Sequence, residues 1–276
     1  MAAERLLTPD ELRMPTLGQL GLDLKTTTAR QRRIALARPW AALALLVALA
    51  LVGWWWATPI AAFMIFVAVV TVTHDVVHRS LGLSRRQTDW ALFFTGLILL
   101  ESGHAYRTTH TQHHCLFPSD DDPEGYPANL SMLGALCYGP VFLVRLWWWA
   151  FHRNRSRPAE RAWMIAEGIA PLAAVGAGVA LWPRAPLPLV YATMMIVGSW
   201  VYPLLTVYLP HHGYGETPLT QTRTLRGRII PAIFLELTYH LEHHLYPQVP
   251  SHNLPEVARR LDPFLDRAGL RAWRVI

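Results

Sequence analysis

Two apolar stretches decide the fold of this 276-residue chain: WAALALLVALALVGWWWA at Trp40–Ala57 and PIAAFMIFVAVVTVT at Pro59–Thr73. A helix needs about 20 apolar residues to cross a bilayer. The second stretch is shorter than that, but it continues into a histidine-containing segment that ends at His78. Two later stretches, Ala162–Trp182 and Leu187–Leu209, are also long and apolar enough. The sequence therefore predicts four transmembrane helices.

The connections within each pair of predicted spans are very short. A few residues around Thr58-Pro59 join the first pair, and Pro183-Arg184-Ala185-Pro186 joins the second. Each pair is therefore predicted to form a helical hairpin. Three other apolar segments do not suit a crossing: Asp89–Leu100 and Ile229–Thr238 are too short, and Leu130–Phe151 contains Arg145 and three consecutive tryptophans. For Leu130–Phe151 we expect an interfacial or re-entrant helix.

The composition agrees with an all-α integral membrane protein. Hydrophobic residues make up 52% of the chain and charged residues only 16%, which is well below the usual share of soluble proteins. The net charge is +6, but the basic residues flank the apolar runs, so anionic lipid headgroups are favoured as partners and nucleic acid is not expected. Two cysteines cannot form a disulfide framework, and the polar first 29 residues lack the apolar centre of a signal peptide.

The distribution of basic residues predicts the orientation. Only Arg184, of the 25 lysines and arginines, lies in a predicted hairpin loop. By the positive-inside rule, the opposite side is cytoplasmic, and it holds both termini. We expect a cytoplasmic N-terminal segment at residues 1–39, a membrane catalytic domain at residues 40–265 and a cytoplasmic tail at residues 266–276. The tail from Leu254 to Ile276 is predicted to be an amphipathic helix and a basic C-terminus.

Eight histidines form three tight clusters: His74-Asp-Val-Val-His78, His110-Thr-Gln-His113-His114 and His240-Leu-Glu-His243-His244. Residues three and four apart share one face of a helix, so each cluster directs its imidazoles toward one point. Neutral imidazole is a good ligand for iron, zinc or copper. Eight imidazoles exceed the needs of one tetrahedral ion, so the pattern predicts two metal ions in a cytoplasmic, histidine-rich cap. All three clusters can meet there only if Leu130–Phe151 does not cross the membrane.

The three clusters resemble the histidine boxes of the membrane fatty acid desaturase and carotenoid hydroxylase–ketolase superfamily. Asp121-Asp122-Pro123-Glu124 follows the second box, and Leu245-Tyr246-Pro247-Gln248-Val249-Pro250 and Asn253-Leu254-Pro255 follow the third, as in that superfamily. The resemblance covers roughly residues 40 to 265. It implies a non-haem di-iron centre held by the eight box histidines, oxygen as co-substrate, and electrons from a ferredoxin- or cytochrome-type donor with its reductase. The substrate would be a membrane lipid or carotenoid.

Further residues are candidates beside the boxes. His211 and His212 lie where the superfamily often supplies another metal ligand; the alternative is hydrogen bonding to loop carbonyls. Asp75 and Glu242 are candidates to accept the second N–H of a ligating histidine, and salt bridges to Arg79 or Arg228 are the alternative. His104 lies six residues before the second box, where its role stays open, and Cys115 is expected to be a small buried residue rather than a ligand.

The boxes alone do not separate acyl desaturation from carotenoid hydroxylation or ketolation. The three-residue spacing in the first box differs from acyl-CoA desaturases, and the short chain is typical of carotenoid enzymes. The Tyr-Pro-x-x-Pro sequence at Tyr246–Pro250 favours an acyl-lipid desaturase, which is our preferred prediction. A histidine-cluster metal transporter is a weaker alternative, because transport sites lie near the middle of the bilayer.

Overall fold

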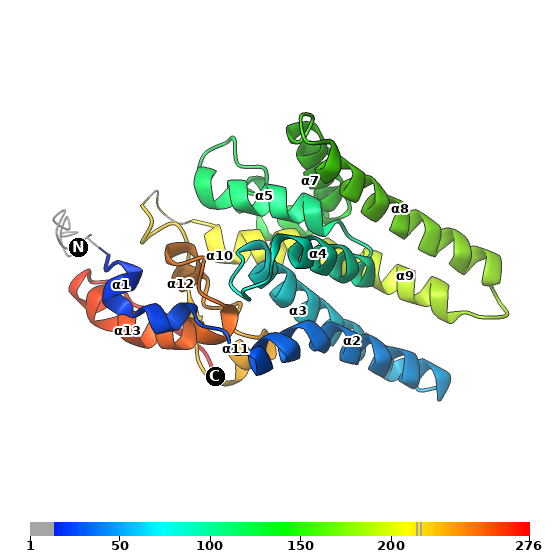
Figure 1. Cartoon of the computed structure of the whole chain (residues 1–276), viewed down its shortest axis with the longest axis horizontal. Coiled ribbons are helices and arrows are strands. Elements are labelled where there is room, and N and C mark those ends of the chain that lie inside the picture. The colour runs from blue at the N-terminus through cyan, green and yellow to red at the C-terminus, as the bar shows by residue number, and fades with distance from the viewer. Residues whose placement is uncertain (1–13, 214, 216) are drawn as a thin grey trace. The chain divides into compact units, whose positions relative to one another are not determined.

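Helices make up most of the chain, as predicted, and the described residues contain almost no sheet. The computed structural model describes residues 14–213, 215 and 217–276 (Figure 1). Contacts within the chain define two compact units. One comprises residues 28–213, and the other comprises the described residues before 28 together with those after 213. Each unit has its own core and its own histidines.

Four helical segments of the described chain are long and apolar enough to cross a membrane: Leu22–Leu51, Trp55–Val77, Pro158–Leu181 and Leu187–His211. The predicted spans are therefore found, although the first is displaced. Its main helix α2 (Ala29–Leu51) begins eleven residues before Trp40, because Thr28 and Gln31 form a capping box at its start. It ends before Gly53, whose positive φ of 81° breaks the helix.

Helix α3 (Thr58–Val77) is the central element of residues 28–213. In its most apolar window 72% of the residues are buried, against 22% for the first segment and 17% for Pro158–Leu181. A short helix η2 (Trp55–Ala57) leads into α3, and α2 packs along α3. Leu46 of α2, Ile65 of α3 and Met195 of α9 are fully buried in one core cluster. The outer helices keep large apolar side chains exposed, which suits contact with lipid.

The second pair of apolar segments is regular at first and irregular at its end. Helix α8 (Pro158–Leu181) packs against α9 (Leu187–Gly198), which lies beside it in Figure 1. The chain then continues through η4 (Ser199–Val201), the π-helix η5 (Pro203–Tyr208) and α10 (Leu209–His211). Proline lacks the backbone N–H that a regular helix uses, so Pro203 and Pro210 account for this break in the α pattern.

Two shorter helices return the chain from α3 to the second histidine box. Helix α4 (Arg85–Leu99) lies against α3, where the Thr73 and Thr95 hydroxyls are 3.0 Å apart. Leu100 adopts a left-handed conformation, and α5 (Gly103–Leu116) then runs back beside α4. A Cβ atom at Gly103 would lie 2.5 Å from the Leu92 carbonyl oxygen, so only glycine permits this close packing. The tight turn sets the second box beside the end of α3.

The predicted interfacial segment Leu130–Phe151 is divided into two helices. A short helix η3 (Tyr126–Asn129) precedes α6 (Met132–Cys137), and α7 (Gly139–Arg153) follows after Tyr138. Neither belongs to the four apolar segments long enough to cross a membrane. This agrees with the expectation that the segment is not a span. Gly139 allows α7 to approach the main chain at Trp200 closely, because a Cβ there would lie 2.0 Å from the Trp200 carbonyl oxygen.

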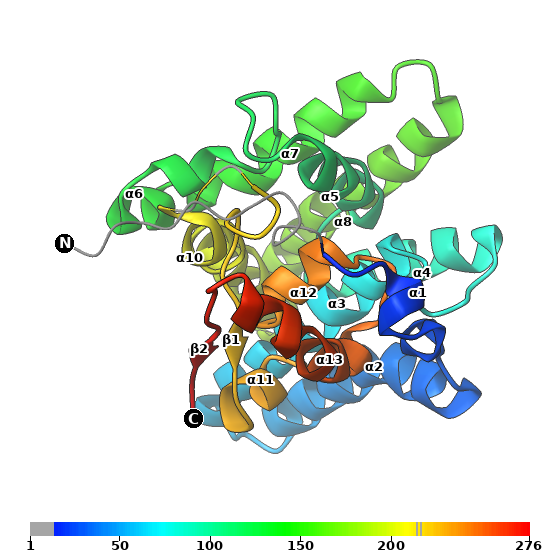
Figure 2. The same ribbon diagram turned by 90° about the vertical axis from the view of Figure 1, so that its left-hand side faces the viewer.

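The other unit joins the start of the chain to its end. Its elements are α1 (Leu17–Leu20), η1 (Leu22–Lys25), β1 (Leu225–Arg226), α11 (Ile229–Ile233), α12 (His240–Leu245), η6 (Ser251–Asn253), α13 (Leu254–Arg267) and β2 (Trp273–Arg274). Helix α13 is amphipathic as predicted, and its buried face packs against α1. The Asn253 amide donates to the Leu24 and Thr26 carbonyls, and the Tyr246 hydroxyl donates to the Pro15 carbonyl. The two strands pair in parallel (Figure 2).

Candidate metal centre

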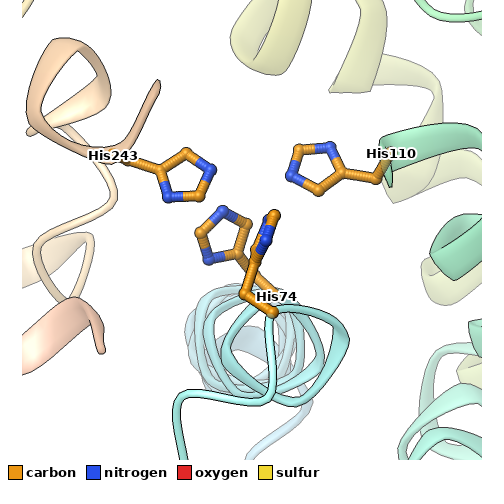
Figure 3. A group of neighbouring side chains, drawn as sticks. His74, His110 and His243 are labelled. Carbon is orange, nitrogen blue, oxygen red and sulfur yellow. The ribbon is translucent and has the colours of Figure 1, made fainter. Parts of the chain in front are cut away.

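The first and second histidine boxes meet at the end of α3. His74 lies in the last turn of α3, and His78 is the residue that caps that helix. Helix α5 contributes His110, whose ring centroid is 5.2 Å from that of His74 and 5.1 Å from that of His78. Each of the three rings offers one nitrogen within 4.8 Å of the others. Figure 3 shows His74 and His110 extending from different helices toward one point.

The second box faces in two directions, in contrast to the prediction that each box directs its imidazoles toward one point. The physical reason is that His113 and His114 are consecutive residues, which lie about 100° apart around the helix axis. His110 and His114 lie on one side of α5, with their Nε2 atoms 3.2 Å apart, and the His114 ring centroid is 4.8 Å from that of His78. His113 instead faces α10, where its Nε2 atom is 3.3 Å from Nε2 of His211. The irregular end of the fourth apolar segment thus supplies a histidine to the second box.

The third box forms its own imidazole pair in the other unit. His240 and His244 lie one turn apart on α12, and their Nε2 atoms are 3.1 Å apart. His243 lies on the same short helix and is buried, with its ring centroid 5.7 Å from that of His244. All three boxes therefore occupy helices or a helix end, as the three- and four-residue spacings predict.

Two carboxyl groups support the second box. Asp122 Oδ2 is 2.6 Å from Nδ1 of His113, and Glu124 Oε2 is 3.2 Å from Nδ1 of His110. Both carboxyl side chains are almost completely buried. A carboxylate that accepts the Nδ1–H of an imidazole fixes the tautomer and leaves Nε2 available as a metal ligand. The Asp122 carboxyl also accepts from the backbone N–H of Glu124, which holds the loop in place.

Burial and mutual repulsion favour neutral imidazoles in this cluster. Burial, together with the nearby His74, lowers the pKa of His78 to about 2. Burial and the neighbouring histidines also lower the pKa of His110 and of His114. Only neutral imidazole has a lone pair for a metal ion, so these shifts keep the rings ready to coordinate at neutral pH.

The carboxyl groups of Asp122 and Glu124 are coupled to the pKa values in the second box. Burial acts to lower the pKa of His113, but the hydrogen bond to Asp122 outweighs it and the pKa is raised. Burial raises the pKa of Glu124 to about 7, although the nearby His113 opposes that shift. The two carboxyl groups are thus coupled to the histidines electrostatically as well as by hydrogen bonds.

The nitrogen-to-nitrogen distances fit shared metal ligation. Two imidazole nitrogens that each bond one ion at about 2.1 Å, at an angle between about 90° and 110°, lie about 3.0–3.4 Å apart. The three Nε2–Nε2 separations, 3.2 Å for His110–His114, 3.3 Å for His113–His211 and 3.1 Å for His240–His244, fall in that range. The donors are all imidazoles, which suits iron, copper or zinc rather than magnesium or calcium.

The remaining predicted residues lie in varied surroundings. Asp75 is buried, with its Oδ1 atom 3.9 Å from Nδ1 of His74. Glu242 is fully buried and accepts hydrogen bonds from Thr224 and Arg226. Its proposed contact with a histidine stays a prediction.

Two further histidines contact protein groups outside the boxes. Nδ1 of His212 is 2.8 Å from the Ala128 carbonyl oxygen. This is hydrogen bonding to a backbone carbonyl, the alternative to metal ligation at this position. His104 is fully buried, and its Nδ1 atom is 2.7 Å from the Glu167 carboxyl.

Cys115 is exposed, in contrast to the expected burial. It follows His113 by two residues and His114 by one, so it lies on a different side of α5.

Sequence reasoning did not identify Asp122 and Glu124 as partners of the histidines. The sequence places both residues only within the Asp121-Asp122-Pro123-Glu124 segment after the second box. Their positions nine and fourteen residues after the histidines they contact give no helical periodicity. The available signal was the concentration of acidic residues in a loop directly after a cluster of candidate metal ligands.

A predominantly helical chain with four apolar segments and clustered, mostly buried histidines defines a class of helical membrane proteins whose histidines could hold metal ions. The model of the fatty acid desaturase family matches residues 53–275, which is well over half of the chain. The chain therefore belongs to the fatty acid desaturase family. Membership indicates an oxidoreductase, and together with the apolar helices it indicates a membrane protein. No curated protein matches this sequence.

Proposed function

We propose that this chain is an acyl-lipid desaturase that uses oxygen and two iron ions to introduce a double bond into a membrane-bound fatty acyl chain. One observation carries the proposal: a member of the fatty acid desaturase family gathers His74, His78 and His110 with ring nitrogens within 4.8 Å of one another. Hydrocarbon chains are available in the bilayer, and a centre next to apolar helices suits such a substrate.

The proposed metal ligands are the eight box histidines with His211. His74, His78 and His110 form one group of donors with His114 beside His110, and His113 with His211 starts a second. His240, His243 and His244 of the third box are proposed as further ligands. Iron supplies the oxidising chemistry when it is bound, and imidazole ligands tolerate it better than thiolates would.

The protein residues have separate roles in this proposal. Asp122 and Glu124 hold His113 and His110 by their Nδ1 atoms, so that both Nε2 atoms keep a fixed direction. His74 and His110 are buried, so bulk water has little access to these rings. His212 is better explained by its hydrogen bond to the Ala128 carbonyl, so we assign it no metal.

The overall reaction requires an electron source outside this chain. Removal of two hydrogens from neighbouring carbons and reduction of one oxygen molecule to two waters consume two further electrons and two protons. A ferredoxin- or cytochrome-type protein with its reductase would supply these electrons, as the resemblance to the superfamily implies. The catalytic domain would comprise residues 40–265, with the two termini outside it.

The proposed orientation places the histidine boxes and both termini in the cytoplasm, with the four spans arranged as two hairpins. It rests on the position of Arg184, the single basic residue in the short connections. Cys115, which is exposed beside the second box, provides a native label. In a Cys137→Ser background, a membrane-impermeant maleimide should label Cys115 in inverted vesicles but not in intact cells. An added Arg184→Cys variant should be labelled in intact cells, and the reverse pattern would contradict the orientation.

The function is tested by expression in a host that makes both saturated membrane lipids and β-carotene, followed by lipid and pigment profiling. New unsaturated acyl chains are expected with the wild-type protein and should be absent with His78→Ala. The exposed His152 lies outside the centre, so His152→Ala is the matched control and should retain activity. Oxidised carotenoids with unchanged acyl chains would overturn the choice of substrate.

A further inference from the structure

Helices α2 and α4 present matching sets of side chains at four-residue intervals. On α2 the order is Arg32, Leu36 and Trp40, and on α4 it is Arg86, Trp90 and Phe94. Residues four apart lie on one face of a helix, so each helix carries a cation, then an apolar side chain, then an aromatic ring along one stripe. Both sets run from the cation toward the aromatic ring in the N- to C-terminal direction.

The two stripes lie next to each other. The Trp40 and Phe94 rings are 6.5 Å apart in an edge-on arrangement, and the Trp90 and Phe94 rings are stacked at 5.5 Å. At the other end, a Cβ atom at Gly82, in the loop before α4, would lie 3.7 Å from a guanidinium nitrogen of Arg32. The two stripes border a groove between α2 and α4, which we call the α2–α4 groove. The cations of both helices lie at one end of this groove, and the aromatic rings Trp40 and Phe94 lie at the other.

A hollow of about 440 Å³ lies between these helices. Leu36, Leu83, Trp90 and Ala91 form its apolar lining. Ser84, Arg86 and Gln87 form its polar rim. A hollow with a cationic rim and an apolar lining matches an amphipathic ligand, because the apolar part is buried while the anionic part stays beside the arginines.

Within the part of the chain that the structure describes, no carboxylate pairs with the cationic end of the groove. No ion pair joins Arg32, Arg85 or Arg86 to a carboxylate among residues 14–213, 215 and 217–276. Asp89 is the acidic residue nearest in sequence to Arg86, but it is already held by Arg107 at 2.7 Å. The positive charge at this end of the groove is therefore available to an external anion.

We propose that the α2–α4 groove binds an anionic glycerophospholipid, with the phosphate beside Arg32 and Arg86 and an acyl chain along Trp90, Trp40 and Phe94. Basic pockets between membrane helices recognise anionic headgroups, and exposed tryptophans favour the lipid–water boundary. The site is separate from the histidine boxes and does not depend on the proposed desaturase reaction. It is a place for a bound lipid that would fix α4 against α2.

The test is retention of added lipid by the delipidated, detergent-purified full chain, measured by native mass spectrometry. Phosphatidylglycerol should be retained in preference to phosphatidylcholine. Each arginine near a membrane surface contributes enough for about a 5-fold effect, so Arg32→Gln with Arg86→Gln should weaken phosphatidylglycerol retention by about 30-fold. Arg153→Gln with Arg155→Gln removes the same charge from exposed positions elsewhere and should change retention little.

Two further arms separate a lipid site from a simple anion site. Trp90→Ala removes apolar surface without changing charge, and it should reduce phosphatidylglycerol retention. Glycerol 1-phosphate, which has the anion but no acyl chain, should not displace the lipid. Equal losses in both arginine double variants would overturn the proposal. Displacement by glycerol 1-phosphate with no effect of Trp90→Ala would overturn it as well. Unchanged thermal unfolding of the Arg32→Gln, Arg86→Gln variant would show that a loss of binding is local.

Discussion

Replacement of Asp122 tests how the loop after the second box supports the metal centre. The Asp122 carboxyl lies 2.6 Å from Nδ1 of His113, and its side chain is fully buried. A hydrogen bond to a charged group contributes about 1.5–3 kcal/mol. Loss of such a partner of a metal ligand lowers metal affinity about 10- to 100-fold, which is about 1.4–2.7 kcal/mol. The two ranges agree, so we expect an effect of this size.

The residue that replaces Asp122 decides where the loss of iron affinity falls between about 10-fold and about 100-fold. Asp122→Asn keeps an acceptor oxygen but removes the charge, so iron affinity should fall about 10-fold. Asp122→Ala removes the acceptor altogether and should approach a 100-fold loss. The assay is iron retained per chain against increasing concentrations of a chelator. The control is Asp121→Asn, which removes the same charge from an exposed neighbouring position.

Two results would refute this reasoning. The first is iron retention in Asp122→Ala equal to that of the wild-type protein. The second is an equal loss in Asp121→Asn, because that would mean that overall loop charge, rather than the contact with His113, sets the affinity.

Two further predictions concern the fourth apolar segment and the smaller unit. His211→Ala should weaken iron retention at least about 10-fold in the same chelator assay, whereas His212→Ala should leave it nearly unchanged, because the His212 ring contacts a backbone carbonyl. Equal effects would contradict the assignment of His211 alone. Leu261→Ala removes a fully buried side chain and should lower the free energy of unfolding by about 2–5 kcal/mol, measured by denaturant titration. Leu22→Ala, at a side chain that is 67% exposed, should change it by less than about 0.5 kcal/mol, and a similar loss at both sites would count against the packing of α13.

The apolar spans could be predicted from the sequence because the information is local. A run such as Pro59–Thr73 is long, apolar and followed by residues that continue the helix, and α3 covers it completely. The start of α2 was less accessible to prediction. Four arginines between Ala29 and Trp40 argue against a buried helix, yet the Thr28 capping box and exposure on α2 allow the helix to begin there.

The spacing within the boxes predicted which histidines share a face, and His110 with His114 is an example. Contacts over long sequence separations were not predictable in this way. The close packing of α4 on α5 depends on Gly103, and the pairing of His104 with Glu167 joins residues 63 positions apart. Asp122 also lies in a loop, where no periodicity reports the direction of a side chain.

The most direct test of the central claim is the metal content of the purified full-length protein, measured together with its oxygen-dependent formation of unsaturated acyl chains. We predict two iron ions per chain, with activity lost when iron is removed by a chelator and regained when iron is restored. A fully active protein that contains no iron would contradict the account.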